Sequence, residues 1–165
     1  MRNRRLILIL LLGAAFLVLA AAAWKVQSGS IPASSKPNTL PQATVHIRGK
    51  KFSLDVATTP SAREIGLSQT DSLPVDRGML FLYDTPDYYQ FWMKGMKFSL
   101  DILFIRDSTI ITIARNVPPP SGNAELPRYA PDEPANKVLE INAGLCNKYG
   151  IREGDTVEII YSTPR

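Results

Sequence analysis

The sequence predicts a mainly β domain, a single antiparallel β-sandwich or barrel with one or two short helices, behind an N-terminal hydrophobic helix. Two observations carry the prediction for the domain. About seven or eight short stretches alternate apolar and polar residues or form short apolar runs, as strands do. Turn-forming residues separate these stretches at short intervals, and only two short stretches have helical patterns, which is typical of all-β folds.

The first 25 residues predict a signal peptide or an N-terminal transmembrane anchor. A basic cluster of Arg2, Arg4 and Arg5 precedes residues 6–24, nineteen residues without a charge. A spanning helix needs roughly 20 apolar residues, whereas the apolar region of a signal peptide has about 7–15. The length therefore favours an uncleaved anchor, and the four alanines at 20–23 leave cleavage open as the alternative. In both cases the arginines hold the N-terminus inside, so we expect the rest of the chain outside the cytoplasmic membrane.

Residues 26–42 are rich in proline and serine and predict a linker, because this composition cannot bury a core. Residues 43–165 have the length of one domain. The net charge of +4 comes from the residues before position 43, which include five of the nineteen basic residues and no acidic one. The domain therefore carries fourteen basic and fifteen acidic residues. A nearly neutral domain gives no argument for nucleic-acid binding, and no nucleic-acid partner is expected.

The first half of the domain predicts a hairpin, a short helix and a strand. Apolar residues at 45, 47, 52, 54 and 56 alternate with polar ones on both sides of Gly49. A short helix is expected over residues 59–67, because Thr59 is a candidate N-cap and Pro60 fits the first helical position. A turn at 73–78 then leads into a strand at 79–83.

The second half predicts further strands around one long loop. A short strand at 91–93 is followed by a hairpin whose arms are 100–105 and 109–114. Residues 116–136 hold six prolines and predict a loop, which at this length is usually functional or disordered. The last expected elements are a strand at 137–142, a helical turn at 143–149 and a strand at 156–161.

A single cysteine and a single histidine limit the possible chemistry. Cys146 has no intrachain disulfide partner and is expected to be a small buried residue rather than a reactive thiol. His46 lies on the polar side of its strand and is expected at the surface. One Cys and one His exclude an ordinary zinc site built from several of them, and no metal or other cofactor is expected. No nucleophile-elbow motif accompanies His46 to support a Ser-His-Asp triad.

Aromatic residues concentrate between positions 81 and 92, where six of the fourteen in the chain lie. They predict either the core of a small β-domain or an aromatic-lined binding surface. The phenylalanines are expected in the core. Trp92, Tyr88 and Tyr89 flank a turn and carry polar tips, so they are candidate ligand-binding residues together with the nearby Lys94.

Three charged residues are candidates for chemistry. Asp101 lies in a strand with two apolar faces, so it is expected to be buried and hydrogen-bonded, paired or protonated. It could bind a ligand or act as an acid or base; the favoured alternative is structural, either capping the N–H groups of a neighbouring loop or pairing with Arg63. Glu140 would complete a carboxylate pair of the kind that glycoside hydrolysis needs. Arg63 is a candidate clamp for an anionic ligand or a structural partner of a carboxylate.

Five short motifs follow one another along the domain: TPSAREIGL at 59–67, GMLF at 78–81, FWMK at 91–94, LDILFI at 100–105 and VLEINAG at 138–144. They resemble the bacterial and archaeal family called domain of unknown function 192, over nearly all of residues 43–161. The resemblance implies a compact, mainly β, jelly-roll-like domain, commonly behind a signal peptide or anchor, with no established activity, cofactor or catalytic residue. The chain departs from the usual pattern at Ser68 and Thr70, where the family commonly has Met and Arg, and at Gly95, Met96 and Ser99, where Asn, Thr and Pro are common.

Three functions remain open at this point. The favoured one is a non-catalytic binding module outside the cytoplasmic membrane, whose ligand is an envelope sugar or a protein partner. The second is a hydrolase or lyase that uses Asp101 and Glu140. The third is a structural partner of an envelope complex that docks through the proline-rich loop at 116–136.

Overall fold

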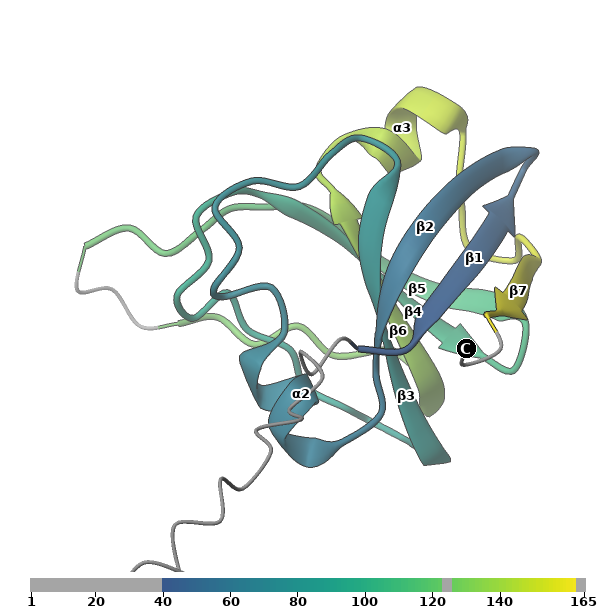
Figure 1. The fold of residues 1–165 in the computed structure, drawn as a ribbon, viewed down its shortest axis with the longest axis horizontal. Helices are drawn as coiled ribbons and strands as arrows, with labels where there is room; N and C mark the ends of the chain where they lie inside the picture. The colour runs from purple at the N-terminus through teal and green to yellow at the C-terminus, as the bar shows by residue number, and fades with distance from the viewer. Residues whose placement is uncertain (1–39, 123–125, 163–165) are drawn as a thin grey trace, which may run out of the picture. The chain divides into compact units, whose positions relative to one another are not determined.

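Seven strands and two short helices form in the part of the chain that the structure describes. The computed structural model describes residues 40–122 and 126–162. All of them belong to the unit Thr39–Arg165. The elements follow one another along the chain (Figure 1) as β1 (Gln42–Ile47), β2 (Lys50–Ala57), α2 (Pro60–Ile65), β3 (Arg77–Asp87), β4 (Leu100–Arg106), β5 (Thr109–Val117), β6 (Ala135–Asn142), α3 (Leu145–Tyr149) and β7 (Val157–Tyr161).

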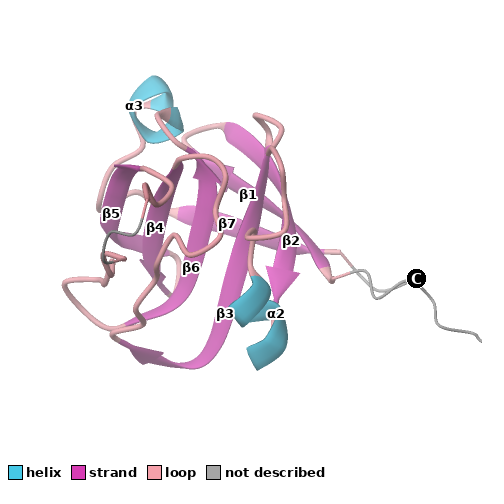
Figure 2. Cartoon of the chain, turned by 90° about the vertical axis from the view of Figure 1, so that its left-hand side faces the viewer, coloured by secondary structure: helices cyan, strands magenta, loops and turns pink. Residues whose placement is uncertain are grey.

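The strands belong to one sheet, in the order β5-β4-β6-β3-β2-β1-β7. The sheet curls into a half-barrel, with α3 at one end and α2 at the other (Figure 2). The two edges of the sheet meet where Thr109, on β5, forms an isolated bridge with Thr156, the residue before β7. Beside this bridge the Val157 N–H donates to the Ser108 carbonyl at 2.7 Å. The predicted mainly β class with two short helices is confirmed, and its architecture is one curled sheet.

The prediction of a wholly antiparallel sheet is wrong at one pair of strands. β2 and β3 run parallel, with Leu54 opposite Gly78 and Val56 opposite Leu80. The connection between them contains α2 and returns the chain to the end of the sheet at which β2 began, so β3 enters in the same direction. The sequence showed the helix and the two strands, but a helical connection of this length allows either direction.

The two faces of the sheet carry two apolar clusters, because strand residues point alternately to opposite sides. We call the first the inner cluster; it includes residues from both edges of the sheet, such as Ile110 on β5 and Val157 on β7, so it lies inside the curl. The second, the outer cluster, contains Phe81, Phe91 and Phe104 and lies on the opposite face under Leu67 and the loop at 91–96. Strand β4 is buried on both faces, since its residues alternate between the two clusters.

Gly78 allows β3 to lie close to both of its neighbours. A Cβ atom at this position would lie 2.5 Å from the Glu140 carbonyl oxygen and 2.8 Å from a methyl carbon of Leu54. Both distances are far below van der Waals contact, so a side chain here would push β6 or β2 away. The glycine of the GMLF motif therefore has a packing reason within the sheet.

Several local predictions are confirmed. The β1–β2 hairpin turns at Arg48 and Gly49, whose φ angles of 49° and 74° are those of a tight hairpin turn. The Thr59 hydroxyl accepts from the Ala62 N–H at 3.2 Å and caps α2, which Pro60 begins. The predicted helical turn at 143–149 forms as α3, after which Gly150 has a left-handed φ of 66°.

Two predicted elements differ from the structure. The expected strand at 91–93 consists only of an isolated bridge between Phe91 and Tyr129, because the proline-rich loop offers a single residue for pairing. Strand β3 is longer than expected and continues to Asp87, past a register shift against β6 that accommodates Pro86.

The predicted N-terminal anchor or signal peptide (1–25) and most of the predicted linker (26–42) lie outside the described residues. Within residues 40–122 and 126–162, no helix has the length and apolar character needed to cross a membrane. The anchor remains a prediction from the sequence.

Candidate functional site

A pocket with a cavity volume of about 90 Å³ opens beside α2 on the outer face of the sheet. We call it the Glu140 pocket. A buried water needs only about 10–15 Å³ of volume measured in this way, so the cavity has room for several waters or a polar part of a ligand. It brings together residues from α2, β3, the loop at 90–96 and β6, namely Arg63, Glu64, Ile65, Gly66, Leu67, Ser68, Phe81, Tyr83, Gln90, Phe91, Trp92, Lys94, Met96 and Glu140.

Glu140 is the buried acid of this pocket. It is opposite Met79 on β3 and Ile102 on β4, so its side chain points to the outer face. The residue is only 5% exposed, and its carboxyl group makes no hydrogen bond with a described residue. No fully buried side-chain oxygen or nitrogen of the described residues lacks a partner, so the Glu140 oxygens border the cavity. Burial raises the pKa of Glu140 from its ordinary 4.5 to about 8, because removal from water penalises the charged form. A protonated carboxyl that can both donate and accept a hydrogen bond therefore lines the pocket at neutral pH.

Arg63 is fixed at the side of the pocket by the backbone. Its Nη1 donates to the Leu82 carbonyl at 2.8 Å and to the Thr58 carbonyl at 2.9 Å. The guanidinium carbon lies 4.7 Å from the centre of the Tyr83 ring, a cation–π distance. Among the described residues Arg63 forms no ion pair, so of the two structural alternatives for Asp101, pairing with Arg63 is not the one that occurs.

Tyr83 lines the pocket, and Tyr89 stacks on its ring. The two rings stack with centroids 3.5 Å apart and an angle of 14° between their planes. Burial raises the pKa of Tyr83 to about 12, Arg63 opposes this shift, and Tyr89 and Glu140 add to it. The phenol is therefore protonated at neutral pH. Tyr88 is 55% exposed, and neither it nor Tyr89 lines the pocket.

Trp92 lies at the pocket and is 44% exposed. Two cationic side chains lie over its ring: Lys94 Nζ is 5.3 Å and the Arg128 guanidinium carbon 5.0 Å from the centroid. Arg128 also donates to the Gln90 side-chain oxygen at 3.3 Å. Neither cation forms an ion pair with a described carboxylate.

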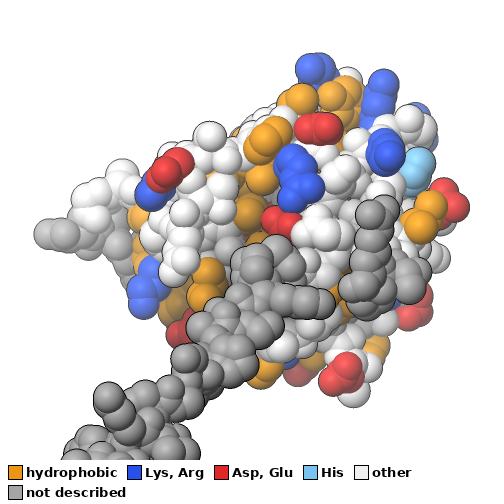
Figure 3. Space-filling view, in the orientation of Figure 1, with side chains coloured by type: hydrophobic (Ala, Val, Ile, Leu, Met, Phe, Trp, Pro, Cys, Tyr) orange, Lys and Arg blue, Asp and Glu red, His pale blue; other side chains and the backbone are white. Residues whose placement is uncertain are grey.

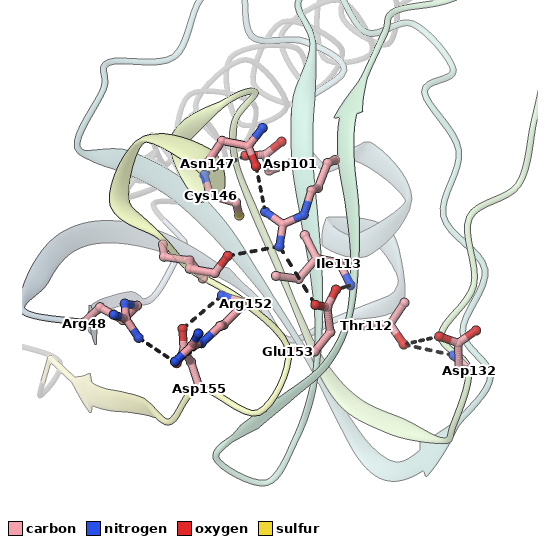
Figure 4. Close-up of polar contacts among 12 residues, drawn as sticks. Arg48, Asp101, Thr112, Ile113, Asp132, Cys146, Asn147, Arg152, Glu153 and Asp155 are labelled. Carbon is pink, nitrogen blue, oxygen red and sulfur yellow. Dashed lines mark hydrogen bonds and ion pairs between the residues drawn. The ribbon is translucent and has the colours of Figure 1, made fainter.

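Asp101 lies on the other face of the sheet and has a structural role. Its residue is 1% exposed, and its two oxygens accept from the Asn116 N–H and the Cys146 N–H, each at 2.8 Å. The favoured expectation for Asp101, capping of backbone N–H groups, is thus what the structure shows. It joins β5 to the start of α3, and Figure 4 shows it beside Cys146 and Asn147.

The structure does not bring Asp101 and Glu140 together. Asp101 is opposite Ile141 on β6, the residue next to Glu140, so the two carboxylates point to opposite faces. Cys146 is buried as expected, and burial followed by the neighbouring Asp101 raises the pKa of its thiol. His46 is half-buried and does not line the pocket.

The predicted ligand-binding residues divide accordingly. Arg63, Trp92 and Lys94 line one pocket with Glu140, whereas Tyr88, Tyr89 and Asp101 do not line it. Sequence reasoning missed Tyr83, Gln90 and Arg128. Arg128 is 36 residues from Trp92 in the chain and reaches it only because Tyr129 pairs with Phe91.

The described residues contain no group of three or more His, Cys, Asp and Glu side chains placed to hold a metal ion. On the face drawn in Figure 3, charged side chains of both signs are interspersed, and hydrophobic side chains show in the hollow between the loops on the left and the sheet. The candidate site is therefore the Glu140 pocket, which offers a neutral carboxyl, aromatic walls and cationic side chains.

The fold and the motifs place the chain in a family. The DUF192 family, described as an uncharacterized ACR, matches residues 43–159, and the chain belongs to this family. The chain is similar to a crystallised protein of unknown function from Novosphingobium aromaticivorans DSM 12444, with 34% identity, a TM-score of 0.64, and coverage of 71% of this chain and 83% of the other.

A second solved structure is similar at the same level. It is a "putative transcription regulator" from Sinorhizobium meliloti 1021, with 34% identity, a TM-score of 0.66, and coverage of 73% of this chain and 95% of the other. No curated protein matches the chain. Because this domain makes up 95% of the Sinorhizobium chain, a relative of it was crystallised with little else, so residues 39–165 are suitable for experiments on the isolated domain.

Proposed function

We propose that the domain is a non-catalytic binding module outside the cytoplasmic membrane, and that the Glu140 pocket takes a small hydroxylated ligand of the envelope-sugar class. One observation carries the proposal. The Glu140 residue is only 5% exposed, its carboxyl group makes no hydrogen bond with a described residue, and it lines a cavity that opens beside the exposed Trp92.

The chemistry of the pocket lining supports a ligand. Water in the cavity can reach this carboxyl group, and a ligand hydroxyl that donates to or accepts from Glu140 would replace the hydrogen bonds of that water. Aromatic side chains beside a few convergent polar groups are the usual composition of small-molecule sites. The rigid contacts of Arg63 with backbone carbonyls hold one polar group in place before any ligand arrives.

Binding is favoured over hydrolysis. Glycosidases place two carboxyl groups on either side of one bond, about 5–10 Å apart and facing the same substrate. Asp101 faces the inner cluster and already accepts two backbone N–H groups, so it is not available as the partner of Glu140.

A second candidate, docking of a protein partner through the proline-rich loop, is favoured by an apolar groove of about 160 Å³. Its lining includes Met93, Leu126 and Tyr129 and the prolines 118–120 and 127. The Leu126→Asp variant is expected to lose a co-purifying envelope protein and to keep its melting temperature. Retention of the same partner by this variant excludes the groove.

The location is proposed from the sequence. Residues 6–24 are taken as the membrane anchor, with the domain outside the cytoplasmic membrane. The chain is then expected to stay in the membrane fraction after carbonate washing. Protease added outside intact spheroplasts is expected to degrade the domain. A chain that resists protease in intact spheroplasts contradicts the proposal, and a soluble periplasmic chain shows that the segment is cleaved.

The pocket is tested with residues 39–165 in a thermal-melting screen against neutral and acidic sugars. A ligand at about 100 times its dissociation constant adds roughly 2.7 kcal/mol, which raises the midpoint by several degrees for a domain of this size. The Glu140→Met and Trp92→Ala variants should lose the shift. Tyr88→Ala removes an exposed aromatic side chain outside the pocket and should keep it. No shift with any sugar, or equal loss in Tyr88→Ala, contradicts the proposal.

A further inference from the structure

Of the described arginines that lack an ion pair, one lines the Glu140 pocket and the other lies over Trp92, which lines it. The described residues contain seven arginines, and five of them form ion pairs with Asp or Glu, at positions 48, 77, 106, 115 and 152. The remaining two are Arg63, which lines the pocket, and Arg128, which lies over Trp92. Lys94 is a third cation at this place without an acidic partner among the described residues. We call these three side chains the cationic rim.

Trp92 orders two members of the rim. Lys94 Nζ and the Arg128 guanidinium lie 5.3 Å and 5.0 Å from the ring centroid. Attraction to the ring holds a cation in place without neutralising its charge. The indole therefore serves here as a support for positive charge.

Arg63 completes the rim on the side of α2. Its bonds to the Thr58 and Leu82 carbonyls use Nη1, so Nε and Nη2 have no hydrogen-bond partner among the described residues. A guanidinium edge of this kind matches the geometry of a carboxylate. Glu140 does not oppose an anion, because its burial keeps it protonated at neutral pH. The exposed Glu64 is the other acid of the lining.

We propose that the ligand of the Glu140 pocket is an acidic sugar of the uronic-acid class, whose carboxylate lies on the cationic rim and whose hydroxyl groups reach Glu140. This inference rests on the proposed function and makes it specific. It follows because Arg63, Lys94 and Arg128 form no ion pair with a described Asp or Glu, whereas the other five described arginines do. A neutral sugar would use Glu140 but leave the rim without a partner.

The test compares galacturonate with galactose, which differ in the anionic group, by calorimetric titration of residues 39–165 at pH 6.5 and low salt. Galacturonate is expected to bind at least tenfold more tightly. The double variant Lys94→Gln/Arg128→Gln should lose at least tenfold in affinity for galacturonate and lose much less in affinity for galactose. The control Lys51→Gln/Lys148→Gln removes two exposed lysines away from the pocket and should bind galacturonate as the wild type does.

The outcomes separate the two proposals. Equal binding of galacturonate and galactose, or equal losses in the rim variant and the control, overturns the acidic-sugar inference and leaves the sugar-binding proposal standing. If galactose 6-phosphate binds more tightly than galacturonate, the choice of a carboxylate as the anionic group of the ligand is overturned. Failure of all three probes to bind overturns the sugar-binding proposal itself and the inference with it.

Discussion

The Glu140→Gln substitution should make the stability of the domain less dependent on pH. Gln has the shape and polarity of a protonated Glu but cannot ionise, so it removes only the titration of the buried group. In the wild type, burial raises the pKa of Glu140 from 4.5 to about 8. The folded state therefore holds the proton more tightly than the unfolded state does, and this proton is lost from the unfolded chain first as pH rises.

The sign and size of the effect follow from this difference. A group with a raised pKa contributes its full stability below the unfolded value, here 4.5, and loses it as pH rises through the folded value of about 8. Each unit of pKa corresponds to about 1.4 kcal/mol, so the wild type should lose on the order of 5 kcal/mol relative to the Gln variant between these two values. Since whole domains have about 5–15 kcal/mol, the effect is large enough to measure.

Urea unfolding of residues 39–165 from pH 4.5 to 8.5 measures this difference. The free-energy curves of the wild type and Glu140→Gln should meet at the acidic end and diverge toward pH 8, where the variant is more stable. Glu158→Gln makes the same chemical change at an exposed position on β7 and should run parallel to the wild type. Parallel curves for Glu140→Gln would refute the burial argument, and so would a variant that is less stable at pH 8.

Three further predictions concern the rest of the sheet. Asp101→Ala should lower the free energy of unfolding by about 2–6 kcal/mol, because the Asn116 and Cys146 N–H groups each lose an acceptor. A loss below about 1 kcal/mol in urea unfolding would contradict this role. Gly78→Ala should lower the free energy of unfolding by about 1–3 kcal/mol, since the new Cβ atom would lie 2.5 Å from the Glu140 carbonyl oxygen. An unchanged free energy of unfolding would contradict this and show that β6 can move away without cost. Cys146 should resist iodoacetamide in the folded domain and react once urea unfolds the domain, because the side chain is fully buried and the pKa of its thiol is raised. Rapid labelling of the native protein would contradict this.

The sequence predicted local structure well because the relevant signals lie within a few residues of one another. The β1–β2 hairpin follows from alternation around Gly49, and α2 follows from Thr59 and Pro60. Burial of Asp101 followed from the apolar residues on both sides of it, since a strand with two apolar faces has no exposed position. These arguments need no knowledge of the neighbouring strands.

The predictions that failed depend on which strands lie side by side. Whether Asp101 and Glu140 share a face is set by the register of β4 against β6, and a difference of one residue moves a side chain to the other face. The parallel direction of β3 depends on the path of the connection through α2. The rim could not be assembled from the sequence either, because Arg128 meets Trp92 through a bridge between distant segments.

The central claim is that the Glu140 pocket binds a ligand, and Trp92 offers the most direct measurement. Trp92 is the only tryptophan in residues 39–165, so the fluorescence of the isolated domain reports on this one position. Titration with galacturonate should give a saturable change in that fluorescence, which Glu140→Met abolishes and Tyr88→Ala preserves. A signal that does not saturate, or one that is unchanged in Glu140→Met, would contradict the assignment of the pocket as the binding site.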